Sequence, residues 1–149
     1  MKRLELISRV RSNTRDFSNS IFRETDIIDY LNEGINRFKQ VIPELLGVVP
    51  LLAQNQEVIL IPSQYQVLLS TYASARCFAQ DERHYQATTL MNEFEVKLQE
   101  LLSEIECGNI VILDTLGVPI VIPLKYNYVD TEAYFGKIYT DLDDGVEGV

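Results

Sequence analysis

Residues 63–106 read SQYQVLLSTYASARCFAQDERHYQATTLMNEFEVKLQELLSEIE, and they contain two apolar stripes at helical spacing. The polar stretch AQDERHY separates the stripes, with Ser63 as the expected cap of the first helix and Asp81 of the second. An antiparallel pair of helices would bury both stripes, so we favour it over one continuous helix from Ser63 to Glu106. Gly108 follows the second helix as its expected terminator. The stripes are Tyr65, Leu68, Leu69, Tyr72, Ala75, Phe78 and Ala79, then Leu90, Met91, Phe94, Leu98, Leu101, Leu102 and Ile105.

Two further helices are predicted before this pair. The first covers residues 2–14, and the second is capped by Thr25 or Asp26 and ends before Pro43, with Gly47 marking the exit. Helical spacing places apolar residues on one face of each. These residues are Leu4, Ile7 and Val10 with Leu6 beside them in the first helix, and Ile28, Leu31, Ile35, Phe38 and Ile42 in the second.

The remaining apolar runs favour extended structure. Val48–Ala53 and Glu57–Ile61 flank a polar turn and predict a β-hairpin at about residues 48–61, with Pro50 restricting the first run to a sheet edge. A lone hairpin is marginal in water, so it should lie on the helices or pair with another chain. Ile110–Leu113 and Val118–Ile122 predict a second hairpin or an extended arm.

The predicted fold is therefore mainly α. Residues 1–108 form a small four-helix domain, an antiparallel helical hairpin plus two N-terminal helices, with the β-hairpin inserted. Residues 109–149 form an extended β-rich arm and an aromatic, acidic C-terminal tail. No apolar run approaches the roughly 20 residues of a membrane span, so we expect a soluble chain made in the cytoplasm, with no membrane partner.

Charge is unevenly distributed along the chain. The net charge is −9, yet residues 1–15 carry five basic residues and one acidic residue, a net charge of +4. The acidic remainder argues against wrapping DNA, which requires a basic stripe. The basic segment, with Arg9 and Arg11, is either a solvated helix face or a contact with an acidic partner. Because residues 107–149 carry two basic and seven acidic residues, the two ends would also suit head-to-tail contact between copies.

No catalytic or metal-binding pattern is present in the sequence, and we expect neither an enzyme nor a cofactor. The single histidine, His84, has no activated serine or cysteine in a recognisable motif, and we interpret it as a hydrogen-bonded imidazole on a helix surface. Cys77 and Cys107 match neither a redox pair nor a zinc site, and we expect two reduced thiols packed as small hydrophobic groups.

The tail, LKYNYVDTEAYFGKIYTDLDDGVEGV (residues 124–149), is rich in aromatic residues but has no apolar periodicity. A disordered tail is usually poor in aromatic residues, whereas Tyr and Phe dominate interface energetics. We therefore favour packing on a partner chain over folding back on this domain or plain disorder. The predicted partner-binding residues of the tail are Tyr126, Tyr128, Tyr134, Phe135 and Tyr139.

Three segments carry recognisable motifs: LISRVRSNTRDF (6–17), ETDIIDYLNEGINRF (24–38) and LSTYASARCFAQDERHYQATTLMNEFEVKLQELL (69–102). The chain resembles the head–tail connector proteins (adaptor or head-completion proteins) of tailed bacteriophages over about residues 4–105. One motif is a capped helix of the form D-x-I-x-x-L/I-N-x-(A/G)-I, here from Asp26 to Ile35. The other is Tyr72-Ala73-Ser74-Ala75-Arg76, followed by Asp81-Glu82 and Asn92-Glu93-Phe94.

The resemblance implies a structural virion protein located at the head–tail interface. Such proteins form a ring, usually dodecameric, that joins the portal protein to a stopper or tail protein below it. The ring extends a channel through which genomic DNA passes without sequence-specific binding, and the C-terminal segment commonly reaches the portal. The alternative is a non-enzymatic helical binding or regulatory module that acts through its C-terminal tail.

Overall fold

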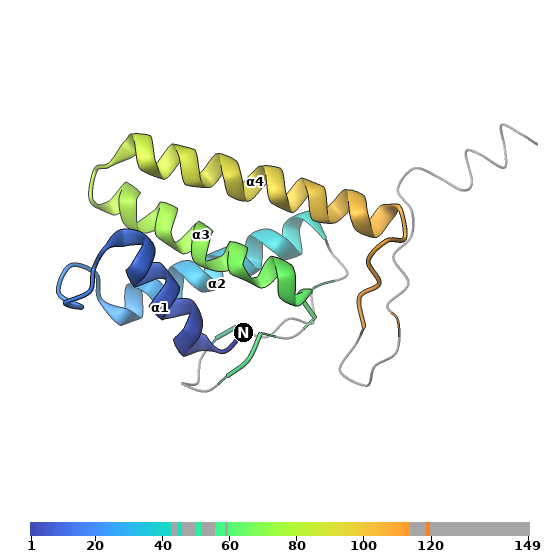
Figure 1. Cartoon of the computed structure of the whole chain (residues 1–149), viewed down its shortest axis with the longest axis horizontal. Coiled ribbons are helices and arrows are strands. Elements are labelled where there is room, and N and C mark those ends of the chain that lie inside the picture. Colours follow the sequence, from blue (N-terminus) through green and yellow to red (C-terminus); the bar gives the residue numbers. More distant parts are fainter. Residues whose placement is uncertain (43–44, 46–49, 52–55, 59, 114–118, 120–149) are drawn as a thin grey trace, which may run out of the picture.

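The structure is a computed structural model, and it describes residues 1–42, 45, 50–51, 56–58, 60–113 and 119. These residues form four helices: α1 (Arg3–Thr14), α2 (Glu24–Val41), α3 (Ser63–Gln80) and α4 (His84–Glu106). The mainly α, four-helix prediction is therefore confirmed (Figure 1). None of the described residues belongs to an extended β-sheet; the only β-type pairings among them are two isolated bridges.

Helix α3 occupies the centre of the domain. It contacts α1, α2 and α4, and it runs antiparallel to α4 along most of its length (Figure 1). In this view α1 and α4 lie on opposite sides of α3, and no Cα atom of α1 lies within 8 Å of a Cα atom of α4. Because α3 separates α1 from α4, each of these two helices has a face directed away from the core.

The polar break between α3 and α4 forms a tight turn, which confirms the predicted pair of helices. Glu82 adopts a left-handed conformation with φ of 60°. The backbone N–H groups of Asp81 and Arg83 bond back to the carbonyl oxygens of Cys77 and Phe78 at 3.0 and 2.9 Å. The predicted caps are wrong. The residue before the helix is Arg23 for α2 rather than Thr25 or Asp26, Pro62 for α3 rather than Ser63, and Arg83 for α4 rather than Asp81. The turn places Asp81 too early to cap α4.

A cluster of three aromatic rings joins α2, α3 and α4, formed by the buried Phe38 and Phe94 and the partly buried Tyr72. The Tyr72 ring meets the Phe94 ring edge-on, with centroids 5.0 Å apart, and Phe94 meets Phe38 at 5.8 Å. On the other side, α2 approaches at Gly34, where a Cβ atom would lie 3.3 Å from Tyr72 Cδ1. Real Cβ contacts are seldom so close, so the glycine allows α2 to approach α3 at this separation.

Two predicted core positions are displaced by one or two residues. Leu4 is 49% exposed whereas Leu6 is fully buried, and Ile28 is only partly buried whereas Ile27 is fully buried. Neighbouring residues lie about 100° apart around a helix. The buried stripe of each helix is centred beside the predicted position, so Leu4 and Ile28 lie at the edge of the stripe. In α2 the stripe is rotated toward Gly34, which faces α3. The other predicted core residues of α1 and α2 are buried.

The inserted hairpin at about residues 48–61 is not seen among the described residues, and much of it lies outside them. Residues 56–58, at the end of its predicted turn and the start of its second run, pair instead with the start of the chain. The N–H of Arg3 bonds to the carbonyl of Gln56 at 2.8 Å, and the N–H of Val58 bonds to that of Met1 at 3.0 Å. Of the predicted arm over residues 109–149, Leu113 and Pro119 form an isolated antiparallel bridge, and most of the remainder lies outside the described residues.

We predict that Gly34→Leu lowers the free energy of unfolding by about 3 kcal/mol, because the new side chain would force α2 away from Tyr72. Asn36→Leu is the matched control: Asn36 lies in the same helix but is exposed, and its change should stay within about 0.5 kcal/mol. Urea unfolding followed by circular dichroism measures both. Equal stability of the two variants would contradict the close α2–α3 approach.

Candidate interaction site

The connection between α1 and α2, residues 15–23, is organised around one buried carboxylate. Asp16 is fully buried, and its Oδ1 atom accepts hydrogen bonds from the N–H groups of Ser20 and Ile21 at 3.0 and 3.2 Å. Its Oδ2 atom accepts the N–H of Phe22 at 3.1 Å and Nη1 of Arg11 at 2.7 Å. Four donors around one side chain fix the backbone of this connection, which we call the apolar loop.

These donors also decide the charge of Asp16. Burial by itself raises the pKa of a carboxyl group, since it disfavours the charged form. The N–H groups of Phe22, Ile21 and Ser20 and the Arg11 guanidinium outweigh burial, and they lower the pKa of Asp16 below its ordinary value of 3.8. Asp16 is therefore a carboxylate at neutral pH.

The apolar loop presents two large apolar side chains to solvent. Phe17 is 75% exposed and Ile21 is 55% exposed, although Phe22, next to Ile21, is buried in the core. Arg15 and Arg23, both exposed, flank them in the sequence. An ordered loop that displays apolar groups is typical of a contact site, because little conformational entropy is lost when it binds.

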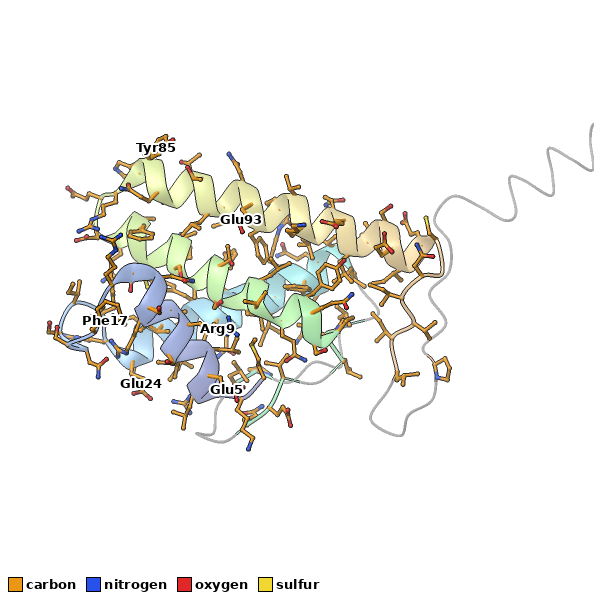
Figure 2. The ribbon with its side chains drawn as sticks, viewed as in Figure 1. Glu5, Arg9, Phe17, Glu24, Tyr85 and Glu93 are labelled. Carbon is orange, nitrogen blue, oxygen red and sulfur yellow. The ribbon has the colours of Figure 1, made fainter. Side chains whose placement is uncertain are left out.

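The two predicted arginine contacts have different surroundings. Arg11 is bonded to Asp16, and its Nη1 atom also donates to the carbonyl of Phe22 at 3.3 Å. Arg9 is exposed on α1 (Figure 2). Arg11 therefore has a structural role that its charge in the sequence does not indicate, whereas Arg9 is open to solvent. Contact of either residue with a partner stays a prediction.

Arg9 borders a groove of about 460 Å³ that lies over α3 between α1 and α4. Figure 2 shows Arg9 on α1 and Glu93 on α4, with α3 passing between them. The floor combines apolar and hydroxyl side chains. The groove is lined by Arg9, Asn13, Val67, Ser70, Thr71, Phe78, Tyr85, Gln86, Thr89, Leu90 and Glu93.

The outward face of α4 is unusual for a solvated helix, because it lacks charge along its centre. Successive turns at three- and four-residue spacing place only uncharged residues there, and we call this row the outer stripe. Tyr85 is 81% exposed and Val96 is 65% exposed. Acidic residues, among them Glu93 and Glu100, lie beside the row. The outer stripe consists of Tyr85, Thr89, Asn92, Val96, Gln99 and Ser103, all of them exposed.

The two thiols differ in environment. Cys77 is buried in α3, where desolvation raises its pKa to about 12, as expected for a cysteine packed as a small hydrophobic group. Cys107 is exposed at the end of α4, so the same prediction is wrong for it. His84 is exposed as the first residue of α4. Within the described residues, no group of three or more His, Cys, Asp or Glu side chains is placed to hold a metal ion.

The aromatic residues of the tail cannot be placed in this site, because Tyr126, Tyr128, Tyr134, Phe135 and Tyr139 lie outside the described residues. No helix that the structure describes is long and apolar enough to cross a membrane. Sequence reasoning missed the apolar loop and the outer stripe. For the apolar loop, the available signal was an Asp followed by Ser and Asn in a connection, a composition that favours hydrogen bonds from side chains to the backbone. For the outer stripe, it was a helix face without charged residues.

Comparison of the chain with protein-family models, with curated proteins and with solved structures returned no match. A functional assignment therefore depends on the contacts, burial and charges of the chain's own residues.

We predict that Asp16→Asn lowers the free energy of unfolding by about 3 kcal/mol, because the amide cannot accept every bond and leaves Arg11 without its charge partner. The folded pKa lies below the unfolded one, so this stabilisation is present above the unfolded value. It is lost as the pH falls from near 3.8 through the folded pKa.

Urea unfolding between about pH 2 and about pH 7, limits that bracket the carboxyl range, measures this effect. The variant should show a shallower loss of stability on the acid side than the wild-type chain. Asp29→Asn is the control, since Asp29 is exposed on α2. Identical acid profiles for Asp16→Asn and the wild type would contradict the role given to this carboxylate.

Proposed function

We propose that this chain is a structural virion protein of a tailed bacteriophage. In this proposal it is an adaptor ring subunit that joins the portal protein to the next neck or tail component and extends the DNA channel. It acts without catalysis or a cofactor, and it is made in the host cytoplasm before it enters the virion neck.

One observation carries the proposal: the motifs on which the resemblance rests converge at one place in the fold. Gly34 of the first motif lies against Tyr72 of the second. Tyr72 in turn packs on Phe94, the last residue of the Asn92-Glu93-Phe94 part of the second motif. The motif residue Arg76 pairs with Glu33 at 3.0 Å and lies 5.4 Å over the Tyr30 ring. Residues far apart in the sequence thus form one packing unit, which supports the resemblance as one of fold rather than of isolated helices.

The charge supports the same proposal. The chain has a net charge of −9, and an acidic channel wall would not retain DNA through counterion release. DNA would then pass through the ring without sequence-specific binding. The exposed apolar groups of the loop and of α4 supply the contact surfaces that a ring subunit needs, both to copies of itself and to a stopper or tail protein.

In the proposed ring, a dodecamer by the resemblance, the aromatic tail is the part that reaches the portal. The tail is acidic, and its five aromatic residues would provide the apolar area of that contact. Arg9 remains a candidate for a second, electrostatic contact.

We predict that a chain truncated after Leu124 keeps its helical circular dichroism spectrum but no longer sediments with portal particles. The reason is that the four helices bury their core without the tail, whereas the tail supplies the portal contact. The control is the full-length chain mixed with the same particles. A truncated chain that still binds the portal would contradict the role of the tail, and a full-length chain that never binds it would favour the regulatory module.

A further inference from the structure

Two surfaces of the described chain have the character of contact sites and no partner within it. The apolar loop exposes Phe17 and Ile21, and the outer stripe exposes Tyr85 and Val96. Both surfaces lie on ordered backbone, so little conformational entropy is lost when a partner covers them.

The charges beside these surfaces are of opposite sign. Arg15 and Arg23 are the two end residues of the apolar loop, and neither forms an ion pair with another described residue. Glu93 lies beside the outer stripe without an ion pair among the described residues, and Glu100 lies beside it paired with Lys97 at 2.7 Å. An apolar loop bordered by basic groups thus matches an uncharged row that carries Tyr85 and Val96 and is bordered by acidic groups.

One chain cannot join its own two surfaces. Phe17 and Tyr85 lie on opposite sides of α3 in Figure 2, and each remains at least three-quarters exposed, at 75% and 81%. The packing of α3 against both α1 and α4 holds the surfaces apart. Any contact between them must therefore link two molecules. Because the two patches differ, the contact is head-to-tail, and such contacts generate rings or open helical assemblies.

We propose that the apolar loop of one copy docks on the outer stripe of the next, and that this contact joins neighbouring subunits. Phe17 and Ile21 cover the uncharged row at Val96, while Arg15 and Arg23 face the acidic residues at its edge. The inference rests on the proposed ring and deepens it, since it assigns the subunit contact to residues of the helical domain rather than to the tail.

Charge reversal in the full-length chain tests this contact. The loop variant carries Arg15→Glu and Arg23→Glu, and the stripe variant carries Glu93→Lys and Glu100→Lys. Each variant alone places like charges at the contact, so its self-association measured by sedimentation velocity should weaken by about tenfold or more relative to the wild type. An equimolar mixture of the two should associate again, because each variant's loop then meets a stripe of opposite charge.

Lys39→Glu is the control, because Lys39 lies on α2 outside both surfaces and its reversal changes the net charge in the same direction as the loop variant. It should self-associate like the wild type. A second readout is disulfide formation between Phe17→Cys of one copy and Val96→Cys of the next, in a Cys107→Ser background. Oxidation should give a ladder of covalent oligomers, whereas Phe17→Cys combined with Asn36→Cys should not.

The outcomes separate this contact from the proposed function. If the wild type forms oligomers but the reversed variants associate equally well and no ladder forms, the contact is wrong while the ring remains. If the mixture of variants fails to recover although each variant is folded and weakened, the complementarity is wrong. If the wild type is monomeric at every concentration and also fails to bind the portal, the contact and the ring are both overturned.

Discussion

The close approach of α2 to α3 at Gly34 is the constraint on which the rest of the structure depends. It brings the Tyr72 ring against α2 on one side and against Phe94 of α4 on the other. The neighbouring buried positions of α3 include the small residues Ala73 and Ser74. Ser74 donates to the carbonyl of Ser70 at 2.6 Å and accepts from Nδ2 of Asn13 at 3.1 Å, which connects α3 to α1. One helix with short side chains thus organises three partners.

This arrangement has a consequence for the surface of the molecule. With α3 between them, α1 and α4 do not pack on each other, and each has a face without a partner among the described helices. The α1 side ends in a loop that Asp16 holds in place, and the α4 side carries a row without charge. Two exposed surfaces on opposite sides of one domain are what the proposed head-to-tail assembly requires.

Much of the helical architecture could be predicted from the sequence. Apolar spacing predicts four helices, and the polar break at residues 81–83 predicts the turn between α3 and α4. Periodicity cannot fix the rotation of a helix to better than about one residue. It therefore places Leu4 in the core beside Leu6, although only Leu6 is buried, and it selects Ile28 where Ile27 is the buried residue. In α2 that rotation is set by Gly34 facing α3, a tertiary contact.

The interaction surfaces were harder to predict, because their physical signals are not periodic. The cage around Asp16 depends on four donors converging in space, and the charge of Arg11 alone indicates a surface residue rather than one of these donors. Residues 56–58 of the predicted hairpin pair with the start of the chain, a partner that local spacing does not indicate. The tail residues that the sequence favours as partner contacts lie outside the described structure and stay predictions.

The proposed ring below the portal is built from many copies of the four-helix domain. Imaging the necks of intact virions by electron cryo-microscopy, with averaging of the region between head and tail, tests it most directly. We expect a closed ring of four-helix domains around the DNA channel, with each apolar loop adjacent to a neighbouring α4. A neck without this chain, in virions whose other components are all accounted for, would contradict the proposal.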